Sequence, residues 1–213
     1  DIGIGTFVDP RQQGGKLNEV TKEDLIKLVE FDNKEYLYYK AIAPDIAFIR
    51  ATTCDSEGYA TFEDEVMYLD ALVIAQAVHN NGGIVMMQVQ KMVKKATLHP
   101  KSVRIPGYLV DIVVVDPDQT QLYGGAPVNR FISGDFTLDD STKFSLPLNQ
   151  RKLVARRALF EMRKGAVGNV GVGIADGIGL VAREEGCADD FILTVETGPI
   201  GGITSQGIAF GAN

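Results

Sequence analysis

A glutamate placed directly after a strand-like apolar run is the residue in this sequence best suited to chemistry. The run 191–195 reads Phe-Ile-Leu-Thr-Val and ends at Glu196, and a stretch rich in glycine and proline, 197–202, follows at once. A near-continuous apolar run is typical of a buried parallel strand, and ligands bind beyond the carboxyl ends of such strands. A carboxylate there can act as a nucleophile, a general base, a ligand-binding group or an ion-paired cap of the strand end.

A glycine-rich stretch, 168–179, lies shortly before this strand and contains Gly171, Val172 and Gly173. Small residues let backbone N–H groups reach a developing oxyanion, and the start of a following helix adds positive potential. A dinucleotide-binding loop is the competing interpretation, but its Gly-x-Gly-x-x-Gly fingerprint requires a third glycine where this sequence has Asp176. A tight strand-to-helix turn without a ligand is also compatible with the pattern, and one turn can serve both purposes.

Four segments resemble, in the same order, segments of family I coenzyme A transferases. Glu196-Thr197-Gly198 is similar to the family's Glu-x-Gly motif, and 168–174 is similar to the glycine-rich loop that precedes it. The first half of the chain resembles the family at 5–16 and 49–58. The resemblance covers nearly the whole chain and is strongest to bacterial transferases that act on short-chain acyl-CoAs such as acetyl-CoA and propionyl-CoA. It implies an α/β fold of open, mainly parallel sheets flanked by helices, in two related domains of which the second is incomplete.

The resemblance also implies a reaction and the residues that perform it. CoA would pass from a short-chain acyl-CoA to a free carboxylate such as acetate, by a ping-pong mechanism with a covalent glutamyl-CoA thioester on Glu196. A carboxylate is ionised near neutral pH, so this nucleophile requires no general base. Gly198 and the loop residues Gly171, Val172 and Gly173 would support the oxyanion and the substrate. CoA is then a substrate, and we expect no cofactor.

Gln13 lies in a glycine-flanked loop that resembles the substrate-side polar segment of the family. A neutral amide can hold a substrate carboxylate without quenching its nucleophilicity, so Gln13 is the candidate for that contact. An exposed glutamine with no specific role is the plainer interpretation. The basic residues near 91–95 and 151–157 are compatible with binding CoA phosphates, but such clusters are more often solvated helix faces, and none is assigned.

Two other function classes remain open on the residues alone. One is a sugar-phosphate isomerase or deaminase that uses Glu196 as a general base, and the other is a non-catalytic metabolite sensor on the same scaffold. His79 and His99 are the only histidines, and neither has the spacing of a metal site. No Gly-x-Ser-x-Gly elbow is present. Cys54 follows a predicted strand and is more typical of a buried or turn cysteine than of a reactive thiol.

Composition and net charge limit the classes of molecule that the protein is expected to bind. The 213 residues carry a net charge of −7, which argues against nucleic acid as a partner, because phosphate binding requires a basic footprint. Two cysteines far apart in sequence indicate reduced thiols and a cytoplasmic protein. No apolar run is long enough to span a bilayer, so we expect no membrane partner. The chain opens with Asp1 in mid-pattern, which predicts a portion of a longer protein, and the resemblance implies a homo-oligomer, either a dimer or a tetramer.

Periodicity predicts the elements of the first half. The runs 25–31 and 36–39 around an Asp-Asn-Lys turn predict a hairpin. A strand is expected over 45–52, and a helix over 63–80 with an apolar face of Val66, Leu69, Val73 and Ala77. The segment 81–83, Asn-Gly-Gly, should end that helix, and 84–89 should be a buried strand parallel to the first.

The second half contains the predicted domain boundary. The run 108–116 is the most strand-like of the chain, and 119–140 is predicted to be loop or edge structure. We predict that 1–143 is the C-terminal part of a first, α-subunit-like domain, and that 144–213 is the N-terminal part of a second, β-subunit-like domain carrying Glu196. A helix from residue 149, a short helix over 180–185 and a strand over 191–196 should surround the glycine-rich loop.

Overall fold

The computed structural model describes residues 2–122, 128–137, 139, 142–143, 145–207 and 210. The chain divides into two compact units, Asp1–Pro44 and Asp45–Asn213. In the first unit, β1 (Ile26–Phe31) and β2 (Lys34–Tyr39) form an antiparallel hairpin. Its two turn residues, Asp32 and Asn33, both have positive φ, 52° and 59°. Such a turn matches the right-handed twist of the strands, and Asp and Asn tolerate it best after glycine, so the predicted hairpin is confirmed.

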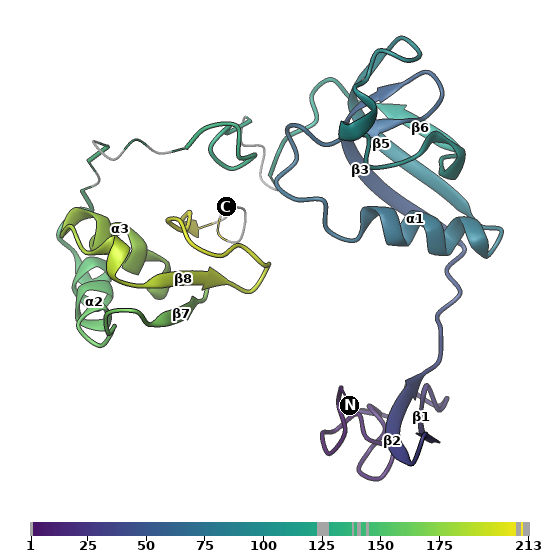
Figure 1. Cartoon of the computed structure of the whole chain (residues 1–213), viewed down its shortest axis with the longest axis horizontal. Coiled ribbons are helices and arrows are strands. Elements are labelled where there is room, and N and C mark those ends of the chain that lie inside the picture. The colour runs from purple at the N-terminus through teal and green to yellow at the C-terminus, as the bar shows by residue number, and fades with distance from the viewer. Residues whose placement is uncertain are drawn as a thin grey trace. The chain divides into compact units, whose positions relative to one another are not determined.

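A four-stranded sheet in the order β4-β3-β5-β6 forms the first core of the second unit. Its strands are β3 (Ile46–Asp55), β4 (Ala60–Thr61), β5 (Ile84–Val93) and β6 (Ile112–Val115), where only β4 runs antiparallel. Helix α1 (Ala71–Asn80) crosses between β3 and β5 and lies along one face of the sheet (Figure 1). The predicted parallel strand–helix–strand unit is therefore confirmed.

The helix α1 is shorter than predicted and buries a different face. It begins after Asp70, and its buried residues are Ala75 and Val78. Val73, placed on the buried face by the sequence pattern, is 57% exposed, and Leu69 is 75% exposed with a positive φ of 43°. The apolar spacing of 66–77 thus predicted both the start and the face of this helix wrongly.

Contacts with β3 explain why the helix does not start at residue 63. The side chain of Arg50 donates to Glu65 at 2.7 Å, and the Asp64 N–H donates to the Thr52 hydroxyl at 2.9 Å. The Thr53 hydroxyl also donates to Glu63. These tertiary hydrogen bonds hold 63–65 in a turn, in which the Glu65 N–H donates to Phe62 O at 3.1 Å, and tertiary context of this kind overrides local helix propensity.

The strand predicted over 108–116 begins later, at Ile112. A 3₁₀ turn, Gly107–Leu109, takes its first residues, because the backbone at Gly107 packs so close to Glu57 that a Cβ there would lie 2.0 Å from the Glu57 carbonyl oxygen. The Asp111 carboxylate accepts the Val85 N–H at 2.8 Å and ties the start of β6 to β5. Another 3₁₀ turn, Pro100–Ser102, precedes this segment. The described residues of 119–140 have no helix or strand, as predicted.

A second core forms around two parallel strands, β7 (Val167–Val170) and β8 (Ile192–Val195). Helix α2 (Gln150–Leu159) begins at Asn149, whose side chain accepts the Lys152 N–H at 3.0 Å, as N-cap asparagines do. The remaining elements are the 3₁₀ turns η3 (Ile174–Gly177) and η4 (Ala188–Asp190) and helix α3 (Ile178–Glu184). The apolar side chains of this core come from both helices and both strands, among them Ala155, Leu159, Val181 and Leu193.

The glycine-rich loop is shorter in the structure than the sequence predicted. Gly168 and Asn169, predicted within the glycine-rich loop, belong to strand β7, so the loop itself is only 171–173. The Met162 side chain packs against the strand at Gly168, where a Cβ would lie 2.8 Å from the Met162 methyl group. Glycine leaves room for this contact. The domain boundary between 143 and 144 stays a prediction, since Phe144 lies outside the described residues. Over the described part of the chain, no helix combines the length and the apolarity needed to cross a membrane.

Candidate active site

The glycine loop and Glu196 leave the same edge of the two-stranded sheet. Strands β7 and β8 are parallel, and Val170 pairs with Val195 in register. Gly171 and Glu196 are therefore the first residues beyond the carboxyl ends of two neighbouring strands, which Figure 1 shows side by side. This is the edge at which open α/β sheets bind ligands. The sequence prediction that 171–173 and Glu196 belong together is supported by this register.

The side chain of Glu196 is exposed and has no interaction partner among the described residues. Among the residues that the structure describes, none donates a hydrogen bond to its carboxylate or forms an ion pair with it. The chain turns back immediately after it, because Gly198 N–H donates to Val195 O at 3.0 Å and Gly201 N–H donates to Leu193 O at 2.7 Å. A free carboxylate at the tip of a strand is available as a nucleophile, and the alternative of an ion-paired strand cap does not fit this geometry.

Gly198 is required by the backbone of this turn. Its φ is +116°, a conformation that residues with a side chain rarely adopt, and a Cβ there would meet no atom within 4 Å. Its N–H is already bonded to Val195 O. What Gly198 offers a ligand is therefore the open space beside Glu196 rather than a free donor.

The loop 171–173 has the features expected of an oxyanion-binding turn. The N–H groups of Val172 and Gly173 donate to no other residue in the described part of the chain. Apart from the chain neighbours, no described residue has an atom within 4 Å of a Cβ built on Gly171 or Gly173, so a ligand can approach the backbone at both positions. Gly173 has a φ of +119°, which explains why glycine stands there, and Val172 is 70% exposed. The roles of these residues stay predictions.

A buried carboxylate that the sequence did not single out organises this loop. Asp176 is fully buried in η3, and Arg151 of α2 donates to it at 3.2 Å. The same Arg151 guanidinium nitrogen donates to Gly173 O at 2.6 Å. Gln206 Nε2 and Gly207 N–H each donate to the Asp176 carboxylate at 3.3 Å, and Thr204 donates to its backbone oxygen at 3.1 Å. Asp176 thus connects α2, the glycine loop and the segment that follows the Glu196 turn.

This arrangement also decides against the dinucleotide-binding interpretation. Asp176 occupies the position at which that fingerprint has its third glycine, and its buried carboxylate sits where a fingerprint glycine would let helix and strand pack closely. One signal in the sequence pointed to it: Asp176 is the only charged residue between 166 and 182. A lone charge in an apolar stretch must find a partner when it is buried, but the sequence does not say which.

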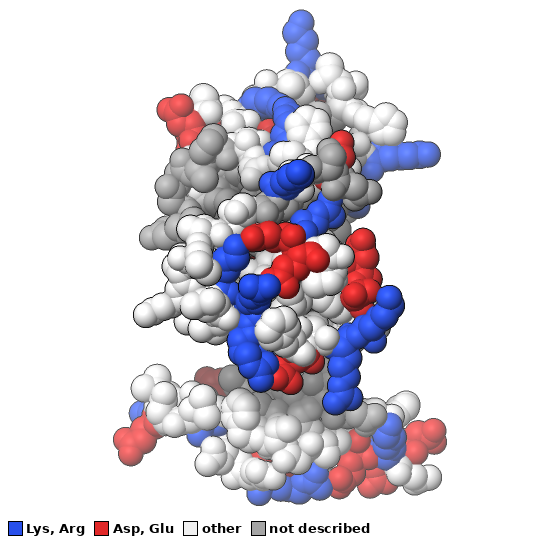
Figure 2. All heavy atoms as spheres, turned by 90° about the vertical axis from the view of Figure 1, so that its left-hand side faces the viewer, with Lys and Arg blue, Asp and Glu red and all other residues white. Residues whose placement is uncertain are grey.

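The basic side chains of α2 are paired with acidic neighbours. Lys152 contacts Glu184 at 2.5 Å, Arg156 contacts Glu185 at 2.6 Å, and Arg157 contacts Glu161 at 2.5 Å. The middle of Figure 2 shows blue and red side chains next to one another over this part of the surface. In the other basic cluster, Lys91 pairs with Glu63 at 3.5 Å and Lys95 with Glu57 at 2.6 Å. Acidic neighbours therefore neutralise most of the charge in both clusters, and no CoA phosphate contact is assigned to either.

Gln13 belongs to the other compact unit, in a loop organised by Asp9. The Arg11 guanidinium, with the N–H groups of Gly5 and Arg11, holds the pKa of the buried Asp9 carboxyl well below its usual range. Asp9 O accepts the N–H of Gln13 at 3.2 Å, and the Gln13 side chain is exposed. The loop therefore holds the backbone of Gln13 and leaves its amide to solvent, which is compatible with the predicted substrate contact without testing it.

The remaining candidate groups are occupied or isolated. Burial raises the pKa of the Cys54 thiol to about 11, and the charge of Asp55 adds to this shift, so Cys54 is a core residue rather than a nucleophile. His99 Nδ1 accepts the Lys101 N–H at 3.3 Å, and the His79 ring packs edge-on against Tyr108. The described residues contain no group of three histidine, cysteine or carboxylate side chains that is able to hold a metal ion.

Comparison with known proteins gives consistent matches. The family model for coenzyme A transferases matches residues 1–116. Acetate CoA-transferase YdiF of Escherichia coli O157:H7 is 99% identical over 213 residues, a match that covers all of this chain and 40% of that protein. Caffeate CoA-transferase of Acetobacterium woodii is 44% identical over 214 residues and is covered to 41%.

A solved structure agrees with these matches. A crystal structure of the acyl-CoA transferase of Escherichia coli O157:H7, described as a thioester complex with CoA, aligns with a TM-score of 0.81 and 96% sequence identity. The alignment covers 96% of this chain and 40% of that one. The chain spans about 40% of the length of the curated relatives named above. Since the family model matches more than half of its residues and the fold agrees, this chain belongs to the coenzyme A transferase family.

Proposed function

We propose that the complete protein transfers CoA between a short-chain acyl-CoA and a free short-chain carboxylate such as acetate, through a covalent glutamyl-CoA thioester on Glu196. The observation that carries this proposal is the exposed, unpartnered Glu196 carboxylate, which leaves the sheet edge in register with the glycine loop. Two names support it, because a relative 99% identical is called an acetate CoA-transferase and a solved relative is described as a thioester complex with CoA.

The first half-reaction needs only the carboxylate and the substrate. A Glu196 oxygen attacks the thioester carbonyl carbon, the C–S bond breaks, and CoA leaves as a thiolate, which produces a mixed anhydride between Glu196 and the acyl group. The thiolate then attacks the Glu196 carboxyl carbon, the anhydride bond breaks, and the first acid leaves as its carboxylate. Glu196 now carries CoA as a thioester. No proton is taken up or released on balance, so these steps require no general base.

The second half-reaction reverses these steps with another acid. The incoming carboxylate attacks the Glu196 carboxyl carbon and displaces the CoA thiolate, which then attacks the acyl carbon of the new anhydride and releases Glu196. Each step passes through a tetrahedral carbon with a negative oxygen, so the protein must supply oxyanion donors and positioning. The free N–H groups of Val172 and Gly173 are the candidates, and Gly198 provides space beside the nucleophile.

The acceptor acid and the assembly are less closely determined. Relatives named for acetate and for caffeate both match the full chain, so membership of the family does not by itself assign the acceptor acid. We propose Gln13 as the contact for its carboxylate. A homo-oligomer is part of the proposal, as is the division into an α-subunit-like and a β-subunit-like domain. The sugar-phosphate enzyme and the metabolite sensor are not favoured, because the matched relatives named here are CoA transferases.

A mass measurement tests the covalent step directly. The complete protein is incubated with acetyl-CoA in the absence of any acceptor acid, and intact-mass and peptide spectra are recorded before and after mild hydroxylamine treatment. We expect a CoA-sized adduct on the peptide containing Glu196 and its removal by hydroxylamine. Glu196→Gln should form no adduct and keep its thermal midpoint, because the exposed side chain makes no contact with other described residues that the amide would lose.

The controls separate the reaction from mere binding. Glu161→Gln alters a glutamate that is likewise exposed, 71% at its side chain, and should form the adduct at the wild-type rate. Initial rates at several fixed concentrations of acid should give parallel lines in double-reciprocal plots. A wild-type protein that turns over but never carries the adduct, or an adduct that persists in Glu196→Gln, would exclude Glu196 as the covalent group.

A further inference from the structure

The Arg151–Asp176 pair holds the glycine loop at the edge from which Glu196 projects. Asp176 is completely buried, and its carboxylate accepts hydrogen bonds from three groups, namely Arg151, Gln206 and Gly207. Arg151 is half-exposed and uses one nitrogen to bind both the Asp176 carboxylate and Gly173 O. Within the described residues, Arg151 is the only side chain that connects α2 to the Gly173 carbonyl. The buried Asp176 carboxylate fixes the position of this side chain.

Fixing Gly173 O fixes the peptide group between Gly173 and Ile174, and with it the end of the 171–173 loop. A trans peptide is planar, and its C=O and N–H point in opposite directions. Glycine with a φ of +119° has access to many backbone conformations, so the loop has little preference of its own at this point. The 2.6 Å hydrogen bond from Arg151 supplies the missing restraint, and it is charge-assisted, which makes it stronger than a neutral one.

The same carboxylate restrains the chain on the other side of Glu196. After the Glu196 turn the backbone returns along β8, with Gly201 N–H bonded to Leu193 O. The next residues reach Asp176, where Thr204 binds its backbone oxygen and Gly207 N–H its carboxylate. One buried residue thus restrains both segments that flank the edge carrying Gly171 and Glu196.

We infer that Arg151 and Asp176 form a positioning pair that sets the orientation of the 171–173 loop for formation of the thioester on Glu196. The inference rests on the proposed function. Neither side chain touches the reacting atoms, so the pair acts through the loop and should affect the rate of the chemical step rather than the binding of acyl-CoA. Misplacement of a catalytic group by about 1 Å typically costs about a hundredfold in rate.

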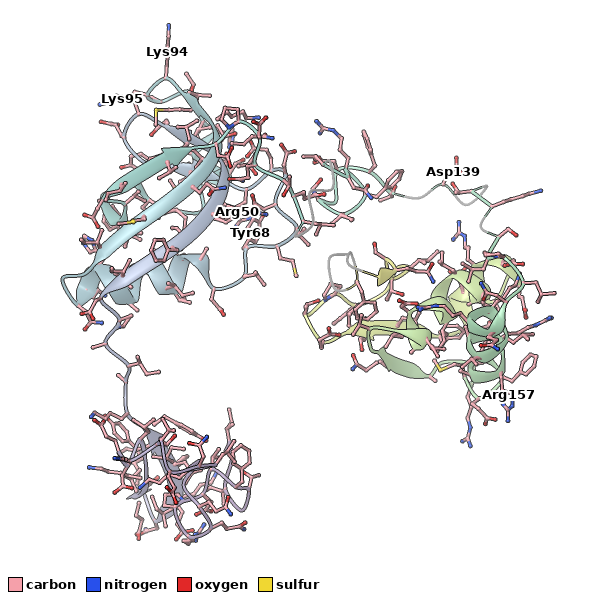
Figure 3. All side chains as sticks on the ribbon, turned by 180° about the vertical axis from the view of Figure 1, so that it is seen from behind. Arg50, Tyr68, Lys94, Lys95, Asp139 and Arg157 are labelled. Atoms are coloured by element: carbon pink, nitrogen blue, oxygen red, sulfur yellow. The ribbon has the colours of Figure 1, made fainter. Side chains whose placement is uncertain are left out.

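The test compares variants of the complete protein in single-turnover experiments with acetyl-CoA. Arg151→Met keeps an unbranched apolar stem and removes both hydrogen bonds, and Arg151→Lys keeps the charge but is shorter and lacks the planar guanidinium. The matched control is Arg157→Met, on the same helix. Arg157 projects away from the ribbon in Figure 3, and its one ion pair with a described residue is to the exposed Glu161. The rate of adduct formation, the acetyl-CoA concentration at half-saturation and the thermal midpoint are measured for each.

We expect Arg151→Met to form the adduct roughly tenfold to a hundredfold more slowly, with half-saturation close to that of wild type. Its thermal midpoint should fall, because the buried Asp176 carboxylate loses its ion-pair partner, and the rates are therefore measured well below that midpoint. Arg151→Lys should recover part of the rate, and Arg157→Met all of it. Asp176→Asn should show the same loss of rate as Arg151→Met if it folds, and the double variant should be no slower than either one.

Three outcomes would overturn the inference. If Arg151→Met forms the adduct at the wild-type rate while Glu196→Gln forms none, the proposed function stands and the positioning pair does not. If Arg151→Met loses rate only in proportion to a lowered thermal midpoint, or raises half-saturation with the rate unchanged, the role is structural or one of binding. If wild type itself forms no adduct, the proposed function fails first, and the inference fails with it.

Discussion

Gly171→Ala is a substitution that asks whether a ligand reaches the glycine loop. Gly171 has an ordinary φ, and a Cβ built on it meets no atom within 4 Å. Alanine therefore fits without strain or clash, and it stabilises a compatible site by about 0.4–1 kcal/mol because the unfolded chain loses freedom. The change should therefore not lower the stability of the folded protein. A loss of activity would then show that the added methyl group obstructs the bound substrate.

The expected loss follows from distances. A methyl group extends about 1.5 Å from the Cα, the length of a C–C bond, and non-bonded carbon atoms prefer separations of about 3.5–4.0 Å. A thioester that packs against the Gly171 backbone would be displaced by about 1 Å or more. A shift of that size corresponds to a fall of about a hundredfold in the chemical step. We therefore expect a folded, slightly more stable protein that forms the Glu196 adduct about a hundredfold more slowly.

The assay is the single-turnover appearance of the CoA adduct, with thermal unfolding measured on the same samples. Val167→Ala is the control, because Val167 lies at the opposite end of β7 from this loop and its side chain is 66% exposed, so its rate should remain near that of wild type. Gly173→Ala is not informative in this way, since its φ of +119° makes any side chain strained by about 1–3 kcal/mol. Wild-type rates in Gly171→Ala would show that the substrate does not approach this loop.

Two further predictions concern groups away from this edge. Burial raises the pKa of the Cys54 thiol to about 11, so Cys54 should resist a disulfide reagent at neutral pH until the protein unfolds, whereas the half-buried Cys187 should react first. The Cys54→Ser variant should therefore have the same number of rapidly reacting thiols as wild type. A fast Cys54 adduct in peptide spectra would contradict this. The hydrogen bonds from Arg11 and from the Gly5 and Arg11 N–H groups lower the pKa of Asp9, so Asp9 stabilises its loop above the ordinary aspartate pKa of about 3.9, and this contribution is lost as the pH falls toward the lowered value. Asp9→Asn should thus lower the thermal midpoint at pH 7 and flatten its decline in acid, and an unchanged acid profile would argue against the Asp9 network.

The sequence was informative wherever a local pattern determined the structure. The Asp-Asn turn between two apolar runs predicts the hairpin, because those residues accept positive φ, and the strand ending at Glu196 follows from its apolar run. Helix α1 shows the limit of such patterns. The spacing of Val66, Leu69 and Val73 is helical. Residues 63–65 nevertheless form a turn, because they make hydrogen bonds with Arg50 and Thr52 of strand β3.

The candidate site divides in the same way. The position of Glu196 beyond a strand and the free space at Gly171 are properties of single segments, and both could be predicted from the sequence. The link from Arg151 to Gly173 joins residues 22 positions apart, and the link from Asp176 to Gly207 joins residues 31 apart. A single sequence carries no signal for such pairs, and the helical position of Arg151 suits a solvated side chain equally well.

The contrast between Asp176 and Glu196 explains why one carboxylate is proposed as the nucleophile and the other is not. Both lie on segments that surround the same small core, but Asp176 is buried and its oxygens accept hydrogen bonds from three donors, so attack on a carbonyl would require giving up those bonds inside the protein. Glu196 is exposed and loses only water when a substrate arrives. Burial and partners, rather than residue type, therefore assign the two roles: a carboxylate that is fully bonded positions the loop, and the one that has no protein partner remains free to react.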